Sequence, residues 1–336
     1  MTPKTVDSIQ EAVNLLSPEC KLLYIAPMYR KNRLGGDYIY LLHKDIIENN
    51  NGIRVKGIKD WSQFRYVFAA RRDKSVVLHY NWLEVQDRFS LFRVIFSWLC
   101  LILYKRFNGK LIWTIHNRTS EVERYQWVNK KIQQWMAINS DLLRVHCRTA
   151  YEEMSDELSV PGSRFIILPH PRFPAYLLPR TAAIEALNQR YQTKLQSRHQ
   201  IFLMFGNIGP HKQILEVIEI FQSLSVNKKL LIVGPVKHGC MNYYRKIKKA
   251  AAEDPESFFL YPKTINADIV PEFFNTADYC LFNYKYTLMS GGVELARSYQ
   301  KPVIAPYMGC LKELRNNPGT HLFHSQSDLK KLLTDI

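Results

Sequence analysis

The feature that most constrains the fold is a regular alternation of short β-rich runs with amphipathic helical stretches along the whole chain. This alternation is typical of parallel sheets covered by helices. In the first half, the predicted strands are 21–27, 75–80, 110–116, 142–147 and 164–169, and the predicted helices lie near 37–49, 87–107, 122–138 and 149–158. In the second half, the predicted strands are 201–206, 228–234, 257–262, 277–282 and 301–306, and the predicted helices lie near 211–224, 240–253, 267–276 and 291–299. Two such sets predict an α/β protein with two Rossmann-like domains.

Residues 169–180 separate the two sets. Four prolines among these twelve residues exclude a continuous helix or a central strand, so we predict an irregular linker, followed by a helical stretch over 181–196. We place the domains at 1–175 and 176–336. Because ligands of open α/β sheets bind beyond the carboxyl ends of the strands, we expect the functional site in a central cleft that the two domains face.

The charge balance of the chain predicts anionic partners. Lysine and arginine number 46 against 30 aspartate and glutamate residues, a formal net charge of +16 that is spread over both halves. Nucleic acid, anionic lipid and phosphorylated small molecules are the partners that such a charge favours. The basic residues are dispersed, and no helix-turn-helix, zinc-finger or RNP pattern occurs, so we expect no nucleic acid.

The cysteines and the apolar runs bear on location. The six cysteines lack the clustered spacing of a zinc site or a disulfide framework, which predicts reduced thiols in the cytoplasm. The N-terminus has no signal-peptide pattern. The longest apolar run, 94–104, has 11 residues, fewer than the ~20 that span a bilayer. We therefore expect a cytoplasmic protein without a membrane span.

A glycine pair follows the first predicted strand. Gly35 and Gly36 precede the helix that begins near Asp37. Free backbone amides and the helix dipole favour an anionic group at such a position, so we assign both glycines to the acceptor side of the site. A flexible loop with a glycine cap is the alternative. No G-x-G-x-x-G pattern occurs, so we expect no dinucleotide cofactor.

Two histidines stand at predicted strand ends in the first half. His116 follows an apolar strand directly, and Glu121 close behind it adds acid–base capacity. His79 ends another strand and is assigned to the acceptor side of the same cleft. Structural histidines are the alternative. The spacing of these residues does not fit a metal site, and we expect none.

In the second half, a strand followed by a glycine-containing turn and a helix spans 205–221. Gly206 lies in the turn, and Lys212 falls in the first turn of the predicted helix. A cation there opposes the helix dipole, and an anionic ligand such as a pyrophosphate supplies a reason for it. A solvated lysine is the alternative.

Another predicted helix begins with a short glycine-containing motif. Ser290, Gly291 and Gly292 open this helix, and Glu294 lies in its first turn. Free amides at such a helix start form an anion site, and Glu294 can accept hydrogen bonds from sugar hydroxyls. A carboxylate that only complements the helix dipole is the alternative.

These last two motifs, at this separation within alternating α/β, resemble the donor half of nucleotide-sugar glycosyltransferases of the GT-B fold. The similarity is to the group 1, family 4-like enzymes that build bacterial polysaccharides. Lys212 matches the lysine that binds the donor pyrophosphate, and Asn207 stands where an arginine is usual. Glu294 matches the glutamate that holds the ribose, while Tyr286 replaces the first glutamate of the Glu-x7-Glu element. His116, in WTIHN, matches the histidine that faces the donor sugar.

The resemblance covers roughly residues 21–325 and implies a glycosyltransferase, specifically a hexosyltransferase. It would move a sugar from a nucleoside diphosphate to a glycan or a lipid-linked glycan, in exopolysaccharide, capsule or lipopolysaccharide synthesis. No metal or other cofactor is expected. Retaining and inverting mechanisms both stay open; an inverting enzyme needs a carboxylate base, for which Glu121 and Asp37 are the candidates. The alternatives are a nucleotide-sugar epimerase of the same fold and a nucleic-acid-binding protein without enzyme activity.

An apolar segment at 89–107 bears on membrane contact. Basic residues flank it, Arg88 before and Lys105 and Arg106 at its end. A helix buried against a sheet is the ordinary interpretation, whereas an exposed helix of this kind lies in a lipid interface. With the net positive charge, this segment predicts peripheral association with the inner, anionic face of the cell membrane.

Overall fold

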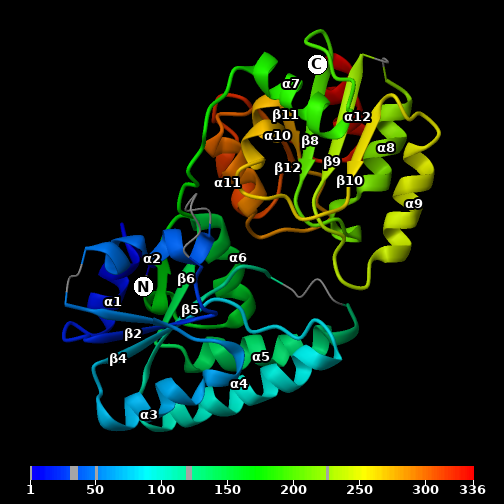
Figure 1. Cartoon of the computed structure of the whole chain (residues 1–336). Coiled ribbons are helices and arrows are strands. Elements are labelled where there is room, and N and C mark those ends of the chain that lie inside the picture. Colours follow the sequence, from blue (N-terminus) through cyan, green and yellow to red (C-terminus); the bar gives the residue numbers. More distant parts are fainter. Residues whose placement is uncertain (1, 31–36, 50–51, 119–122, 225–226) are drawn as a thin grey trace. The chain divides into compact units, whose positions relative to one another are not determined.

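In the computed structural model, residues 2–30, 37–49, 52–118, 123–224 and 227–336 are described. The chain divides into two compact units, unit 1 (Met1–Pro171) and unit 2 (Arg172–Ile336) (Figure 1). The sequence placed the boundary after residue 175, four residues later. Residues 168–179 contain no helix or strand, so the irregular linker predicted from its prolines is confirmed.

Unit 1 contains a parallel sheet whose strand order is β1-β7-β6-β5-β4-β2-β3. Its strands are β1 (Lys4–Thr5), β2 (Leu22–Ala26), β3 (Arg54–Gly57), β4 (Val76–Tyr80), β5 (Lys110–Thr114), β6 (Leu142–Val145) and β7 (Phe165–Ile167). Its helices are α1 (Ile9–Leu16), α2 (Tyr38–Glu48), α3 (Phe64–Arg72), α4 (Arg88–Arg106), α5 (Gln126–Asn139) and α6 (Arg148–Leu158), with 3-10 turns η1 (Asp60–Ser62), η2 (Glu123–Tyr125) and η3 (Gly162–Arg164). Helices α1 and α2 cover one face of this sheet, and α3, α4 and α5 cover the other (Figure 1).

Unit 2 repeats this plan with the strand order β10-β9-β8-β11-β12-β13. Its strands are β8 (Gln200–Phe205), β9 (Lys228–Val233), β10 (Phe258–Tyr261), β11 (Tyr279–Leu281), β12 (Val303–Pro306) and β13 (Thr320–Phe323). Its helices are α7 (Arg180–Tyr191), α8 (Ile214–Gln222), α9 (Met241–Ala251), α10 (Val270–Thr276), α11 (Gly291–Ser298) and α12 (Gln326–Asp335), with 3-10 turns η4 (Pro210–Lys212) and η5 (Gly309–Leu314).

The hydrophobic core of unit 2 lies in two layers because side chains of successive strand residues point to opposite faces. On one face, Ile201 and Leu203 of β8 pack in one cluster with residues of α7, α10 and α11. On the other, Phe202 and Met204 pack with α8, α9 and α12. Strands buried on both faces read as continuous apolar runs, which is why the ten strands predicted from such runs are all present.

Within the described residues, no helix combines the length and the apolarity that crossing a bilayer requires. Cys20, Cys100, Cys240 and Cys280 are free thiols, so the prediction of reduced cysteines holds for these four. The two parallel α/β units confirm the predicted fold class.

Candidate functional site

At the carboxyl edge of the unit 2 sheet, Lys212 reaches back over the end of β8. The sequence placed Lys212 in the first turn of a helix, but it lies in the separate turn η4, before α8 begins. Gln213, with φ +44°, breaks the continuity between turn and helix. The Lys212 side chain is only 8% exposed, and its Nζ donates to the Phe205 carbonyl at 2.7 Å. The ammonium group is therefore fixed at the strand end.

Two glycines let the backbone approach closely at this edge. Gly206 (φ +103°) and Gly234 (φ +138°) follow β8 and β9 in conformations that side chains rarely adopt. A Cβ on Gly234 would lie 2.5 Å from the Gly206 carbonyl oxygen, and a Cβ on Gly206 would lie 2.9 Å from Lys212 Nζ. Any larger residue at Gly206 would displace the ammonium group. Asn207, the next residue, is exposed.

The second motif of unit 2 forms the N-terminus of α11. Ser290 is the N-cap, and its Oγ accepts from the Val293 amide at 3.2 Å. Gly291 and Gly292 are the first two helical residues, whose amides have no partner within an α-helix. A Cβ on Gly292 would lie 3.0 Å from the Phe282 ring, so a side chain there would require that ring to move. This end of α11 can bind an anion.

The two motifs meet through residues that the sequence analysis did not select. The His211 ring, adjacent to Lys212, lies parallel to the Tyr284 ring, with an interplanar angle of 11° and 6.5 Å between centroids. The Tyr284 hydroxyl shares a 2.7 Å hydrogen bond with Ser290 Oγ. The turn after β8 and the start of α11 therefore belong to one continuous edge, because β8 and β11 are neighbours in the sheet.

Glu294 lies in the first turn of α11, as predicted. Its two carboxylate oxygens each accept from Arg297 Nη1 at 2.9 Å. The pairing fixes the orientation of the carboxylate and leaves its other lone pairs for further donors.

At the carboxyl edge of the unit 1 sheet, rings from four loops gather around Tyr38, the first residue of α2. His116 follows β5 and stacks on Trp82, with centroids 4.1 Å apart. The Tyr38 ring centroid lies 5.3 Å from that of His116, 6.3 Å from that of His146 and 4.7 Å from that of His170. We call these five residues the imidazole cluster. It is the counterpart, in unit 1, of the edge that carries Lys212 in unit 2.

Arg144, in β6, supports the imidazole cluster from inside the sheet. The residue is fully buried, at 0% exposure. Its guanidinium donates to the Tyr38 hydroxyl at 2.5 Å, to His146 Nδ1 at 3.4 Å, and to the carbonyls of Leu168 and Pro169 at 2.9 and 3.0 Å. In the described residues, no carboxylate forms an ion pair with it, so its charge is held by neutral acceptors alone.

A buried chain of hydrogen bonds holds the other side of Arg144. His43 Nδ1 bonds to the Ile39 carbonyl at 2.7 Å, His43 Nε2 to His79 Nδ1 at 2.8 Å, and His79 Nε2 to Thr114 Oγ1 at 2.7 Å. A carbonyl can only accept a hydrogen bond, and an arginine can only donate one. With both imidazoles neutral, these two ends determine which atom carries the proton in every hydrogen bond of the chain. His43 donates to Ile39, His79 donates to His43, and the Thr114 hydroxyl donates to His79 while accepting from Arg144 at 3.5 Å.

His79 is thus occupied on both nitrogens and fully buried in β4. Its geometry gives it a supporting role behind Arg144, while the acceptor-side role assigned from the sequence stays a prediction.

All the cluster histidines are neutral at pH 7. Burial, reinforced by the Arg144 charge and by neighbouring imidazoles, holds the pKa of His116 and that of His146 well below 6.5. Burial lowers the pKa of His170 to about 4. Since His146 Nδ1 accepts from Arg144, its proton is on Nε2. Within the described part of the chain, Nε2 of His116 and of His146 are buried without a hydrogen-bond partner. Neutral imidazoles of this kind can bind hydroxyl groups.

Asp37 caps helix α2, since its Oδ1 accepts from the Tyr40 amide at 2.9 Å. Of the other residues that the sequence selected in unit 1, Gly35, Gly36 and Glu121 lie outside the described residues. Among the residues that the structure describes, no three histidine, cysteine, aspartate or glutamate side chains are grouped so that they could hold a metal ion.

The residues that sequence reasoning missed in unit 1 had a weak signal. Arg144 is a charged residue inside the apolar run 142–147, and a buried charge needs a reason. His146 and His170 follow strands β6 and β7 just as His116 follows β5. Treating every polar residue at a strand end as one set would have found them.

Comparisons with known proteins give the fold a family context. No protein-family model and no curated protein matches the chain in sequence. Among solved structures, HepE from Anabaena, crystallised with UDP and glucose, superimposes with a TM-score of 0.68 at 12% identity, over 94% of this chain and 89% of that chain. Sucrose-phosphate synthase from Thermosynechococcus elongatus gives a TM-score of 0.64 at 15% identity, over 100% of this chain and 86% of that chain.

WaaG, a glycosyltransferase involved in lipopolysaccharide biosynthesis, gives a TM-score of 0.59 at 15% identity, over 94% of this chain and 90% of that chain. These proteins are GT-B glycosyltransferases. At such identities, the likeness concerns the fold, and the chain has the GT-B fold.

Proposed function

We propose that this protein, built on the GT-B fold, is a glycosyltransferase that moves a hexosyl group from a nucleoside diphosphate sugar to a hydroxyl of a glycan or a lipid-linked glycan. The observation that carries the proposal is the edge of unit 2, where a buried ammonium (Lys212) and the N-terminus of α11 belong to one continuous surface. Both features bind phosphate.

The proposed donor chemistry is positioning and charge stabilisation. Lys212 and the amides of Gly291 and Gly292 bind the diphosphate, and they bind it more tightly as negative charge develops on the leaving group. Glu294, oriented by Arg297, accepts hydrogen bonds from the ribose. Asn207 lies at the same strand end and contacts the donor. HepE was crystallised with UDP and with UDP-glucose, so a UDP-sugar is the first donor to test.

The proposed acceptor chemistry belongs to unit 1. The neutral rings of His116 and His146 bind hydroxyl groups of the sugars, and the contact with Arg144 sets the tautomer of His146. A carboxylate base, Asp37 or Glu121, is needed only if the configuration inverts. Asp37→Asn separates the two roles of that residue, because asparagine caps a helix as well as aspartate but cannot act as a base.

We place the reaction in the synthesis of exopolysaccharide, capsule or lipopolysaccharide, at the cytoplasmic face of the cell membrane. WaaG, which shares the fold, acts in lipopolysaccharide biosynthesis. A lipid-linked acceptor requires the enzyme to approach a membrane, and the net charge of +16 favours peripheral association with an anionic one.

Thermal-shift measurements with UDP-, GDP- and CMP-linked compounds test the donor assignment. We expect stabilisation by one nucleotide class, since a ligand at 100 times its Kd adds ~2.7 kcal/mol. Glu294→Gln is expected to weaken that binding, and Glu256→Gln, at an exposed residue that precedes β10 at the opposite, amino edge of the sheet, serves as the control variant. If no nucleotide stabilises the protein, the proposal is wrong. Donor turnover that needs no acceptor would indicate an epimerase instead.

A further inference from the structure

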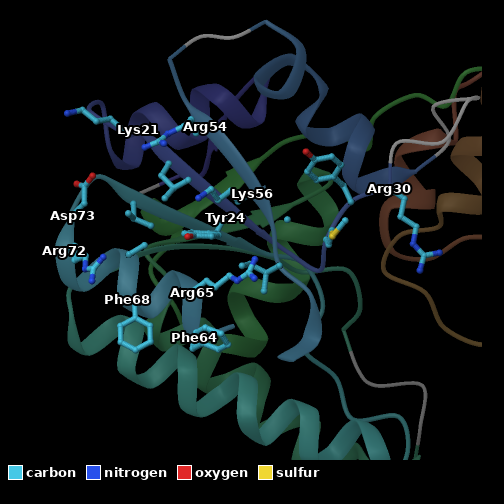
Figure 2. A pocket seen from close by; sticks show the side chains of 17 residues that line it. Lys21, Tyr24, Arg30, Arg54, Lys56, Phe64, Arg65, Phe68, Arg72 and Asp73 are labelled. Carbon is cyan, nitrogen blue, oxygen red and sulfur yellow. The ribbon is translucent and has the colours of Figure 1, made fainter. Parts of the chain in front are cut away.

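Unit 1 carries a large groove beside strand β3, the edge strand of its sheet. Figure 2 shows the groove between this strand and α3, with Tyr24 on its floor. Its volume is about 1120 Å³. The lining of the groove shares no residue with the imidazole cluster and is of a different chemical kind.

The lining of the groove is strongly basic. Six cations and a single carboxylate, Asp73, line it. The cations are Lys21, Arg30, Arg54, Lys56, Arg65 and Arg72. All six are exposed, and among the described residues none forms an ion pair. Like charges held together repel one another, and a cleft lined by one sign of charge concentrates counter-ions. An anionic ligand would remove the repulsion.

Asp73 does little to neutralise these cations. Its Oδ1 accepts from the Ser75 amide at 2.8 Å, which lowers the pKa of the carboxyl and holds it in the turn before β4. Burial raises the pKa of the Tyr24 hydroxyl, and the positive charges of Arg65 and Arg54 both oppose that rise. Asp73 is therefore the single carboxylate in the lining, and it is already engaged by the backbone of its own turn.

An apolar rim borders the groove. Phe64 and Phe68 of α3 are 47% and 56% exposed, and their rings meet edge to face with centroids 6.3 Å apart. An adjoining cavity of about 940 Å³ shares Arg65 with the groove and includes Trp61. The Trp61 ring lies 5.5 Å from that of Phe96 in α4, so the rim continues onto that helix.

Helix α4 presents an exposed apolar stripe next to this rim. Residues three or four positions apart share one side of a helix. The exposed apolar residues follow that spacing, and they are Phe89, Phe92, Ile95, Leu99, Ile102 and Leu103. The opposite side, with Val94, Leu101 and Tyr104, is buried. Continuous exposed apolar surface is unusual in a soluble domain and marks an interaction site.

We propose that this groove binds the phosphate-bearing headgroup of an anionic membrane lipid, while the rim and the α4 stripe contact the acyl region. Cations beside apolar and aromatic side chains are the combination by which proteins lie in a lipid interface. A soluble acidic glycan would use the cations but would leave the α4 stripe exposed. The inference rests on the proposed membrane association and assigns its site.

Vesicle sedimentation tests the groove. The probes are phosphatidylcholine vesicles with and without phosphatidylglycerol. The groove variant is Arg54→Gln/Lys56→Gln/Arg65→Gln, and the matched control is Lys246→Gln/Lys248→Gln/Lys249→Gln, on the exposed side of α9. Each base near an anionic membrane surface is worth about a factor of five in partitioning, so the groove variant should bind about a hundredfold more weakly. The control should bind nearly as well as the unmodified protein.

A second variant tests the rim. Phe64→Ser/Phe68→Ser should reduce the part of the binding that survives high salt, because apolar contact is not screened and the rim supplies a share of that contact beside the α4 stripe; an unchanged salt-resistant part would overturn the role of the rim. Unchanged tryptophan fluorescence of each variant shows that unit 1 is folded.

The outcomes separate the two proposals. Equal losses in the groove and α9 variants would show binding by overall charge and overturn the groove assignment alone. Failure of the unmodified protein to bind either vesicle overturns the membrane association as well. Binding of polygalacturonate that depends on the groove, without vesicle binding, indicates an acidic glycan and overturns the lipid assignment. UDP binding, measured in parallel, tests the glycosyltransferase proposal separately.

Discussion

The carboxyl edges of the two sheets are formed by different kinds of chemical group. In unit 2, the edge consists of backbone amides, two positive-φ glycines and one lysine, all within short stretches of sequence. In unit 1, it consists of rings from separate loops around a buried arginine. The first suits a diphosphate, whose charge needs amides and a cation. The second presents neutral rings over a buried guanidinium and suits hydroxyl groups.

The two edges should also differ in whether a substitution changes ligand binding or the stability of the fold. The unit 2 edge relies on local turns, so single substitutions there should alter ligand binding and leave the fold intact. The unit 1 edge is part of the core, since Arg144 and His79 are buried among the strands. Substitutions there should affect folding first.

The largest expected effect is that of pH on unit 1. Burial lowers the pKa of His43 and that of His170 to about 4, from 6.5 in the unfolded chain. Between these values the unfolded chain binds more protons, so the free energy of unfolding is highest above pH 6.5 and falls toward pH 4. Each shift corresponds to about 3 kcal/mol. Tryptophan fluorescence in urea measures unit 1 alone, because all six tryptophans lie there.

Unit 2 provides the internal control for this measurement. In its described residues, no histidine is buried, so its transition, followed by circular dichroism, should change less over the same pH range. Equal acid sensitivity of the two units would contradict the contrast.

The next effect concerns Arg144. Arg144→Met should lower the free energy of unfolding of unit 1 by about 2–4 kcal/mol, because the buried carbonyl of Leu168 and the part-buried carbonyl of Pro169 lose their donor. Arg148→Met, at an exposed ion pair with Glu152, should change it by less than about 0.5 kcal/mol. UDP binding should be the same in both variants. If the Arg144→Met protein kept its stability but bound UDP more weakly, Arg144 would belong to the ligand-binding site and not to the core.

Lys212→Ala should weaken UDP binding and leave the stability of the protein unchanged. Loss of a charge-assisted contact costs about 1.5–3 kcal/mol, which corresponds to about 10- to 100-fold weaker UDP binding in calorimetry. The unfolding transition of unit 2, followed by circular dichroism, should not move. Lys246→Ala, on α9, removes the same charge away from the edge and should leave the affinity unchanged. Equal affinities of the Lys212 and Lys246 variants would remove the basis for the donor site.

The smallest effect compares the two helix caps. Asp37→Ala and Ser290→Ala should each cost about 1 kcal/mol of stability, since each loses the acceptor of its N-cap bond. Only Ser290→Ala should also weaken UDP binding, because its hydroxyl links the α11 terminus to Tyr284. Thermal unfolding with and without UDP measures both quantities.

Periodicity was sufficient to predict most of the fold, because buried parallel strands are continuous apolar runs. Three strands escaped this signal: β1 has two residues, β3 alternates bases with Val55 and Gly57, and β13 includes His321. Helices α1, α3 and α12 were also missed; in α3, exposed Phe64 and Phe68 obscure the amphipathic pattern.

The two candidate edges differed in how far the sequence could predict them. The unit 2 edge follows from local motifs, in which a glycine, a lysine or a cap acts within a few residues. The imidazole cluster depends on pairing between distant strands, such as the contact between Arg144 and Tyr38, which are 106 residues apart. No local pattern encodes such a contact. The left-handed conformation of Gln213 sets Lys212 in its own turn before α8 rather than in the helix, a difference that periodicity alone does not show.

Strand β3 has a further consequence for the chain in solution. It is an edge strand that pairs only with β2 in the described residues, so its other side presents free amides and carbonyls to any strand that approaches. Arg54 and Lys56 on this strand oppose a second copy of the same strand by charge repulsion, a common protection against edge-to-edge aggregation. The cations that favour an anionic surface therefore also keep molecules apart. Neutralising them should be accompanied by a lower solubility limit, most of all when no anionic surface is present.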